Sequence, residues 1–251
     1  MRSEKGAIEE NLKSLSDYIA RADIRGMDII GFPEMSITGY ADPTKYPRAV
    51  IRLDGEEMGA VLRMTRGRKA TVLAGLIEEN PDGKPFITQV VIRDGQLMGY
   101  YRKRTIKDEE KEWFSPGEAS AVFPHDDVTF GIALCSDIAN EEVFSDCAQQ
   151  GVQIIFELAA PGLQGDQAER NWQSGFQWWE GECQERLSAY AQKHGIWIAV
   201  ATQAGRTTDE DFPGGAYVFA PDGRRVYATH DWYPGAVHLS LDTKKNKVTE
   251  L

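Results

Sequence analysis

The stretch that decides the fold is an apolar run ending in a cysteine, Phe130-Gly131-Ile132-Ala133-Leu134-Cys135, followed by Ser136-Asp137. The run has the length and composition of a buried β-strand, and the end of such a strand faces the cleft where α/β sheets place their chemistry. Cys135 is therefore a candidate nucleophile. Cysteine is also among the residues most often buried without any reactivity, so other residues must decide.

A nucleophilic cysteine needs a base for its proton and a group that stabilises the oxyanion. The usual base is histidine, but none of the four histidines ends an apolar run: His125, His194, His230 and His238. A cysteine–histidine pair is therefore poorly supported, and a carboxylate is the alternative base.

Two further apolar runs also end in a titratable residue. Residues 28–33 lead to Glu34, and residues 96–102 lead to Lys103. Taken singly, Glu34 reads as a turn carboxylate and Lys103 as a surface lysine. Three strand ends that carry Glu, Lys and Cys in this order favour a functional set instead.

At this point the chain resembles the nitrilase, or carbon–nitrogen hydrolase, superfamily. Between residues 6 and 242 the motifs that carry the resemblance are Gly31-Phe32-Pro33-Glu34, Thr38-Gly39-Tyr40, Tyr101-Arg102-Lys103, Phe114-Ser115-Pro116-Gly117, Leu134-Cys135-Ser136-Asp137, residues 148–155 and residues 214–223. The resemblance implies an α/β fold, the four-layer α-β-β-α sandwich. Residues 1–5 are short, charged and unlike the strand with which the family usually opens, so that strand is either absent or the chain starts late.

The resemblance also implies a mechanism. Glu34 would be the base for the Cys135 thiol, which requires that burial raise the pKa of Glu34 toward neutrality. Lys103 and the backbone N–H of Ser136 would stabilise the oxyanion, and a thioester would form and then be hydrolysed. Glu110 would be the family's second glutamate, which orients substrate or water. Its neighbours Glu109 and Glu112 leave the register open.

Composition indicates one ordinary enzyme domain over residues 1–251. The net charge of −11 and the pI near 4.9 argue against nucleic-acid binding, which needs clustered Lys and Arg. No apolar stretch is long enough to span a membrane, and the start of the chain is unlike a signal peptide. We therefore expect a cytoplasmic protein without a membrane or nucleic-acid partner.

The sequence indicates neither a metal nor a cofactor. The cysteines Cys135, Cys147 and Cys183 form no cluster of metal-site spacing, and their odd number fits reduced thiols. Walker-type, dinucleotide-binding and GxSxG motifs are all missing.

Helical and strand-like patterns alternate along the chain. Helices are predicted at 7–24, 56–66, 142–150 and around 181–194. Strands are predicted before Glu34 and at 71–78, 86–92, 96–101, 130–135, 152–158, 196–202 and 237–241, with hairpin turns at Asp94-Gly95 and at 221–223.

Three functions remain open. The first is amidase-type hydrolysis of a small amide or carbamoyl compound by Glu34, Lys103 and Cys135. The second keeps the triad but hydrolyses a nitrile or transfers the acyl group. The third is a catalytically weak binding or assembly protein. The resemblance further implies a homodimer or larger homo-oligomer, and the aromatic residues between Trp172 and Trp179 would line a pocket, the core or a subunit interface.

The residues after the cysteine predict the charge of the substrate. Ile138 and Ala139 stand where carboxylate-binding relatives tend to carry arginine, and neither can pair with a carboxylate. The acids Asp137, Glu141 and Glu142 follow and would repel an anion. A neutral or cationic amide is therefore expected, unless another arginine, Arg170 or Arg206, reaches the pocket.

Overall fold

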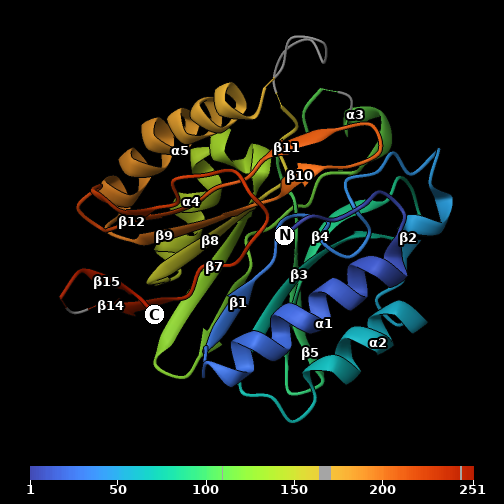
Figure 1. The fold of residues 1–251 in the computed structure, drawn as a ribbon, viewed down its shortest axis with the longest axis horizontal. Helices are drawn as coiled ribbons and strands as arrows, with labels where there is room; N and C mark the ends of the chain where they lie inside the picture. Colours follow the sequence, from blue (N-terminus) through green and yellow to red (C-terminus); the bar gives the residue numbers. More distant parts are fainter. Residues whose placement is uncertain (109, 164–170, 244) are drawn as a thin grey trace. The chain divides into compact units, whose positions relative to one another are not determined.

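The computed structural model describes residues 1–108, 110–163, 171–243 and 245–251. The chain divides into two compact units, Met1–Ala119 and Ser120–Leu251, and each is described by itself (Figure 1). The single domain expected over residues 1–251 stays a prediction.

The first unit is built on a five-stranded mixed sheet in the order β1-β3-β4-β5, with β2 also paired to β3. The strands are β1 (Ile29–Gly31), β2 (Val50–Ile51), β3 (Thr71–Glu78), β4 (Phe86–Arg93) and β5 (Gln96–Arg102). β1 and β2 run parallel to β3, whereas β3, β4 and β5 are antiparallel neighbours. The predicted turn between β4 and β5 is present, with φ values of 47° at Asp94 and 74° at Gly95.

Two helices, α1 (Ile8–Ile24) and α2 (Glu56–Thr65), cover one face of this sheet (Figure 1). α1 carries its apolar residues at helical spacing, and Leu15 and Ile19 are fully buried in a core shared with α2 and β3. Each such side chain contributes about 1.5–3 kcal/mol by leaving water. Residues 1–7 form neither helix nor strand. The unit also holds the short helices η1 (Pro47–Ala49) and α3 (Glu110–Trp113).

The second unit is built on a six-stranded sheet in the order β13-β12-β9-β8-β7-β6. Its strands are β6 (Val122–His125), β7 (Val128–Leu134), β8 (Ile154–Ala159), β9 (Trp197–Thr202), β12 (Ala216–Phe219) and β13 (Arg225–Ala228). β7, β8 and β9 are parallel, so each connection between them needs a crossover, supplied by α4 (Glu141–Gln149) and α5 (Trp172–His194). Two separate hairpins follow, β10 (Ala204–Arg206) with β11 (Asp211–Pro213), and β14 (Leu239–Asp242) with β15 (Lys247–Glu250).

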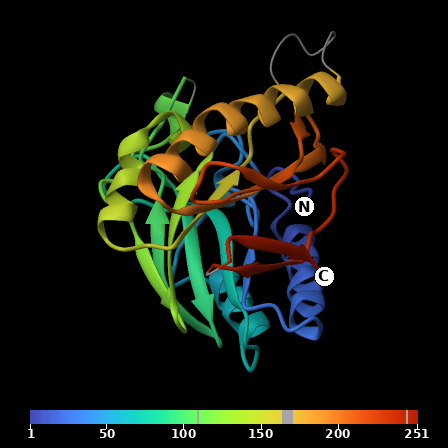
Figure 2. The same cartoon turned by 90° about the vertical axis from the view of Figure 1, so that its left-hand side faces the viewer.

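Helix α5 begins at Trp172, earlier than the start predicted near Gly181. The Asn171 side chain caps it by accepting a hydrogen bond from the Ser174 N–H. Two glycines, Gly175 and Gly181, hid the helical pattern, and a Cβ at Gly175 would displace the Leu163 side chain. α5 lies along one face of the sheet (Figure 2), and the Trp179 Nε1–H donates to Thr202 Oγ1 at 2.8 Å.

Candidate active site

Glu34, Lys103 and Glu110 come together in the first unit. The Lys103 Nζ lies 2.9 Å from Glu34 Oε1, and it donates to the two Glu110 oxygens at 2.7 and 3.0 Å. The exposed fractions are 0% for Glu34, 1% for Lys103 and 6% for Glu110. One ammonium therefore serves two carboxylates away from bulk water, where charge-assisted hydrogen bonds are strongest.

Glu34 lies in a tight turn that packs against β3 and is hydrogen-bonded to it. The turn follows β1, and Met35 directly after Glu34 adopts a positive φ of 50°. It can approach β3 so closely because Gly75 has no side chain, and a Cβ there would overlap the Met35 nitrogen. Ser36 accepts a hydrogen bond from the Gly75 N–H at 2.9 Å, which fixes the turn.

Glu110 opens α3 and pairs with Lys103, and its role as the second glutamate stays a prediction. Its carboxylate is buried against Lys103, whereas Glu112 on the same short helix is exposed. Glu109 lies outside the described residues. Glu110 is thus the acid beside Lys103 in the part of this run that the structure describes.

Tyr40 is a member of this cluster that the sequence did not single out. Its hydroxyl donates to Glu110 Oε1 at 2.9 Å, although the two residues are seventy positions apart. The only signal was its place in the motif Thr38-Gly39-Tyr40. With Lys103 and Tyr40 both donating to it, the Glu110 carboxylate has a fixed orientation.

Cys135 lies in the second unit, directly after β7 and at the start of the 3-10 helix η2 (Cys135–Ala139). Its φ of +44° is a left-handed conformation that a residue with a side chain adopts only under strain. The turn is supported by Asp137, whose carboxylate accepts a hydrogen bond from the Leu134 N–H at 3.0 Å. A strained, partly exposed residue at the carboxyl end of parallel strands is typical of a reactive position.

The other two cysteines are buried. Burial, with a smaller contribution from Glu157, raises the pKa of the Cys183 thiol well above its usual value. Cys147 packs against Gly131 of β7, where a Cβ would lie 2.8 Å from its sulfur. Ser136 follows Cys135 in η2, and its N–H as an oxyanion donor stays a prediction, as do the roles of the other site residues.

The acids expected to repel an anionic substrate are partly engaged elsewhere. Asp137 is fully buried and supports the cysteine turn. Glu141 pairs with Lys193 at 2.6 Å, and the hydrogen bond from Lys193 lowers the pKa of Glu141. Of the two alternative arginines, Arg206 pairs with Asp211 at 3.0 Å and Arg170 lies outside the described residues. These acids therefore repel an anionic substrate less strongly than the sequence indicated.

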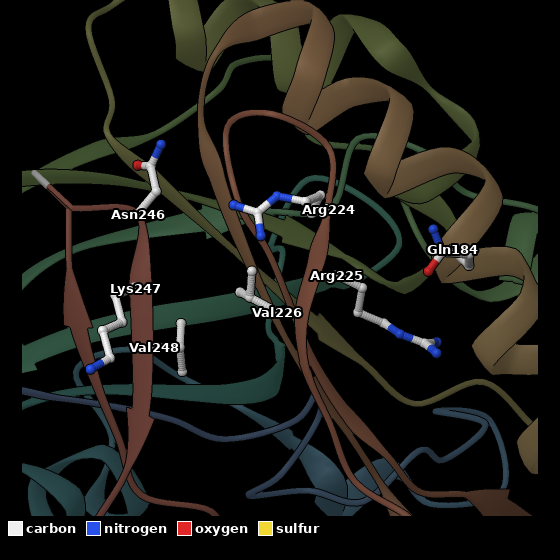
Figure 3. Close-up of a pocket in the computed structure, with 7 residues that line it drawn as sticks. All are labelled: Gln184, Arg224, Arg225, Val226, Asn246, Lys247 and Val248. Carbon is white, nitrogen blue, oxygen red and sulfur yellow. The ribbon is translucent and has the colours of Figure 1, made fainter.

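A groove of about 610 Å³ lies elsewhere in the second unit, between α5, β13 and β15 (Figure 3). Val226 and Val248 face each other across it and Arg224 reaches over it. Its lining contains no cysteine, histidine or acid, and none of the predicted site residues. We therefore assign no chemistry to this groove.

Among the residues that the structure describes, no three His, Cys, Asp or Glu side chains are grouped to hold a metal ion. No helix in the same part of the chain is long and apolar enough to cross a membrane.

The chain belongs to the carbon–nitrogen hydrolase family, whose sequence pattern matches residues 1–244. It is 26% identical over 249 residues to a glutamine-dependent NAD(+) synthetase of Thermotoga maritima, covering 96% of this chain and 41% of that protein. It is 29% identical over 143 residues to a formamidase of Bradyrhizobium sp., covering 56% of this chain and 42% of that protein. The chain thus spans less than half the length of these relatives.

Solved structures show the same fold. A glutamine-dependent NAD+ synthetase from Acinetobacter baumannii superposes with a TM-score of 0.82 at 20% identity, over 100% of this chain and 46% of that one. An amidase of the nitrilase superfamily from Nesterenkonia AN1 gives 0.78 at 22% identity, over 93% and 85%. The predicted α/β class and nitrilase-type fold are confirmed, and family membership supports an enzyme that acts on a carbon–nitrogen bond.

Proposed function

We propose that this chain hydrolyses the carbon–nitrogen bond of a small amide through a thioester on Cys135. The observation that carries the proposal is the buried cluster of Glu34, Lys103 and Glu110, because it gathers a general base, a cation and a second carboxylate away from bulk water. The strained Cys135 supplies the nucleophile.

The proposed reaction needs only these residues, the Ser136 N–H and water. Glu34 takes the thiol proton, and the thiolate attacks the carbonyl carbon while the Lys103 ammonium and the Ser136 N–H stabilise the oxyanion. The intermediate expels the amine, which receives its proton from Glu34, and leaves a thioester. Glu34 then removes a proton from water, which attacks the thioester. The intermediate releases the acid and expels the Cys135 thiolate, which takes its proton back from Glu34. Glu110 holds Lys103 in place and orients the amide.

The favoured substrate is a small neutral or cationic amide or carbamoyl compound, as the lack of an arginine at Ile138 and Ala139 predicts. In support, a Glu-to-Gln mutant of the Nesterenkonia amidase shows covalent addition of the acetamide moiety of fluoroacetamide at its active-site cysteine. A second candidate is the side-chain amide of glutamine, because the likeness to glutamine-dependent NAD synthetases runs over 96% of the chain. Nitrile hydrolysis and acyl transfer would use the same three residues.

The test is intact-mass and peptide-level detection of an adduct across amides, nitriles and carbamoyl compounds, together with ammonia release. Formamide, butyramide and glutamine separate the two amide candidates, and added hydroxylamine reports acyl transfer. Cys147 and Cys183 serve as internal controls because both are buried. An adduct confined to Cys135 is expected, and no adduct and no turnover with any compound would favour a binding or assembly protein.

A further inference from the structure

Arg102, the last residue of β5, is held in place by an ion pair and by two aromatic rings. Its guanidinium donates through Nε and Nη2 to the two oxygens of Glu78 at 2.8 and 2.5 Å. It also stacks over the rings of Phe86 at 4.1 Å and Tyr100 at 4.9 Å. Glu78 is buried and accepts a further hydrogen bond from Thr88 at 2.7 Å, so this anchor is itself fixed.

The backbone just beyond Arg102 is held from two sides. The Lys103 N–H donates to the Ile87 carbonyl at 2.9 Å, which continues the ladder between β4 and β5. The Lys103 carbonyl accepts from the Gly117 N–H at 2.7 Å. Gly117 must be a glycine for this approach, because a Cβ there would overlap the Arg102 carbonyl oxygen.

The segment that contains Gly117 is itself tied to β4. Ser115 forms an isolated parallel bridge with Phe86, and its N–H donates to the Pro85 carbonyl at 2.9 Å. The segment Phe114-Ser115-Pro116-Gly117 therefore runs from the start of β4 to the residue that follows β5. No step of the proposed reaction uses this motif.

Lysine has a long flexible stem, so its ammonium is placed accurately only if its backbone is fixed. Successive residues of a strand point to opposite faces, so anchoring Arg102 on one face directs Lys103 to the other, where Glu34 and Glu110 lie. We propose that the Glu78–Arg102 pair and Gly117 are positioning residues that set the Lys103 ammonium between its two carboxylates. This inference rests on the proposed function, since it presumes that Lys103 acts in the reaction.

The test compares Arg102→Lys and Gly117→Ala with the wild-type protein in kcat, KM and the pH profile of kcat/KM. A displacement of about 1 Å in a catalytic group can cost about a hundredfold in rate. We therefore expect kcat to fall at least tenfold in each variant while KM stays within about twofold. A displaced ammonium also stabilises the Glu34 carboxylate less, so the acidic limb of the profile should move to higher pH.

The matched control is Arg52→Lys. Arg52 forms the same two-point pair with Asp54, at 2.8 Å for both bonds, but on an exposed loop. The Arg52→Lys variant should leave kcat and the pH profile of kcat/KM unchanged. If Gly117→Ala does not fold, Arg102→Lys decides alone.

Two results would overturn the positioning role. One is wild-type kcat and an unmoved acidic limb in Arg102→Lys while Lys103→Ala is inactive. The other is a loss of activity that follows only the loss of folded protein, again with the limb unmoved. Full activity in Lys103→Ala would instead refute the proposed function itself.

Discussion

Replacing Lys103 by methionine tests whether the buried cluster holds real charges. Methionine keeps the length and volume of the lysine stem but removes the ammonium that lies within 3.0 Å of three carboxylate oxygens. Glu34 and Glu110 then face each other without a cation at 0% and 6% exposure. Removing one partner of a buried ion pair costs about 3–5 kcal/mol, because the remaining charge stays buried and unpaired.

The pH dependence of this loss has a definite sign. Without the ammonium, the two buried carboxylates repel each other. Protonation of one of them removes this repulsion, and protonation becomes more favourable as the pH falls. The loss in unfolding free energy should therefore be close to the full 3–5 kcal/mol at pH 8 and clearly smaller at pH 5. Glu110→Gln combined with Lys103→Met should recover part of it, because one of the two charges is gone.

The assay is urea unfolding, for which an m-value near 2–3 kcal/mol/M converts the loss to a midpoint shift of about 1–2.5 M. The matched control is Lys45→Met, whose lysine is 74% exposed and pairs with Asp42. It should change the unfolding free energy by less than about 0.5 kcal/mol. A cost below about 1 kcal/mol for Lys103→Met, equal at pH 5 and pH 8, would refute the reasoning.

Four further predictions concern the reaction, the folding stability and the assembly. Cys135→Ala should abolish turnover and Glu34→Gln should lower it about a hundredfold or more, and near wild-type turnover by the cysteine variant would contradict the mechanism. The raised pKa of Cys183 means that above about pH 8.5 the unfolded chain loses this proton while the folded chain keeps it. The unfolding free energy should therefore fall as the pH rises, by at most about 1.4 kcal/mol per pH unit from this group, and Cys183→Ala should flatten that slope. A matched pair of amides with and without a terminal carboxylate should favour the neutral one, and a tenfold advantage in kcat/KM for the carboxylate would reverse this expectation. Light scattering at micromolar concentration should report at least a dimer, and a species of 28.0 kDa alone would exclude it.

The strands and helices with clear periodicity were predictable because their signals are local. The strand at 71–78 and the hairpin turn at Asp94-Gly95 were found as predicted. The sequence also put Glu34, Lys103 and Cys135 at or just beyond strand ends, because each comes at the end of a strand-like run. Helix α5 was predicted, but its start was placed too late. Glycines and aromatic residues interrupt the helical pattern in its first turns, and these turns become recognisable only from their packing against the sheet.

Other parts of the site depend on contacts between segments far apart in the chain. Tyr40 meets Glu110 only because the turn after β1 and helix α3 are folded onto the same place. Whether Glu110 or Glu112 faces Lys103 is decided by the direction of one short helix, which the composition of a charged run does not contain. The engagement of Glu141 by Lys193 likewise joins α4 to the end of α5.

The sequence by itself determined the family, the α/β class and the residue types that end three strands, because these follow from local hydrophobic patterns and short motifs. Only the tertiary structure decided that a buried lysine is shared by two carboxylates, that Tyr40 joins them, and that Gly75 and Gly117 allow the backbone to approach Met35 and Arg102. The physical reason is that hydrogen bonds and close packing depend on distances in space, and these distances exist only after the strands have paired.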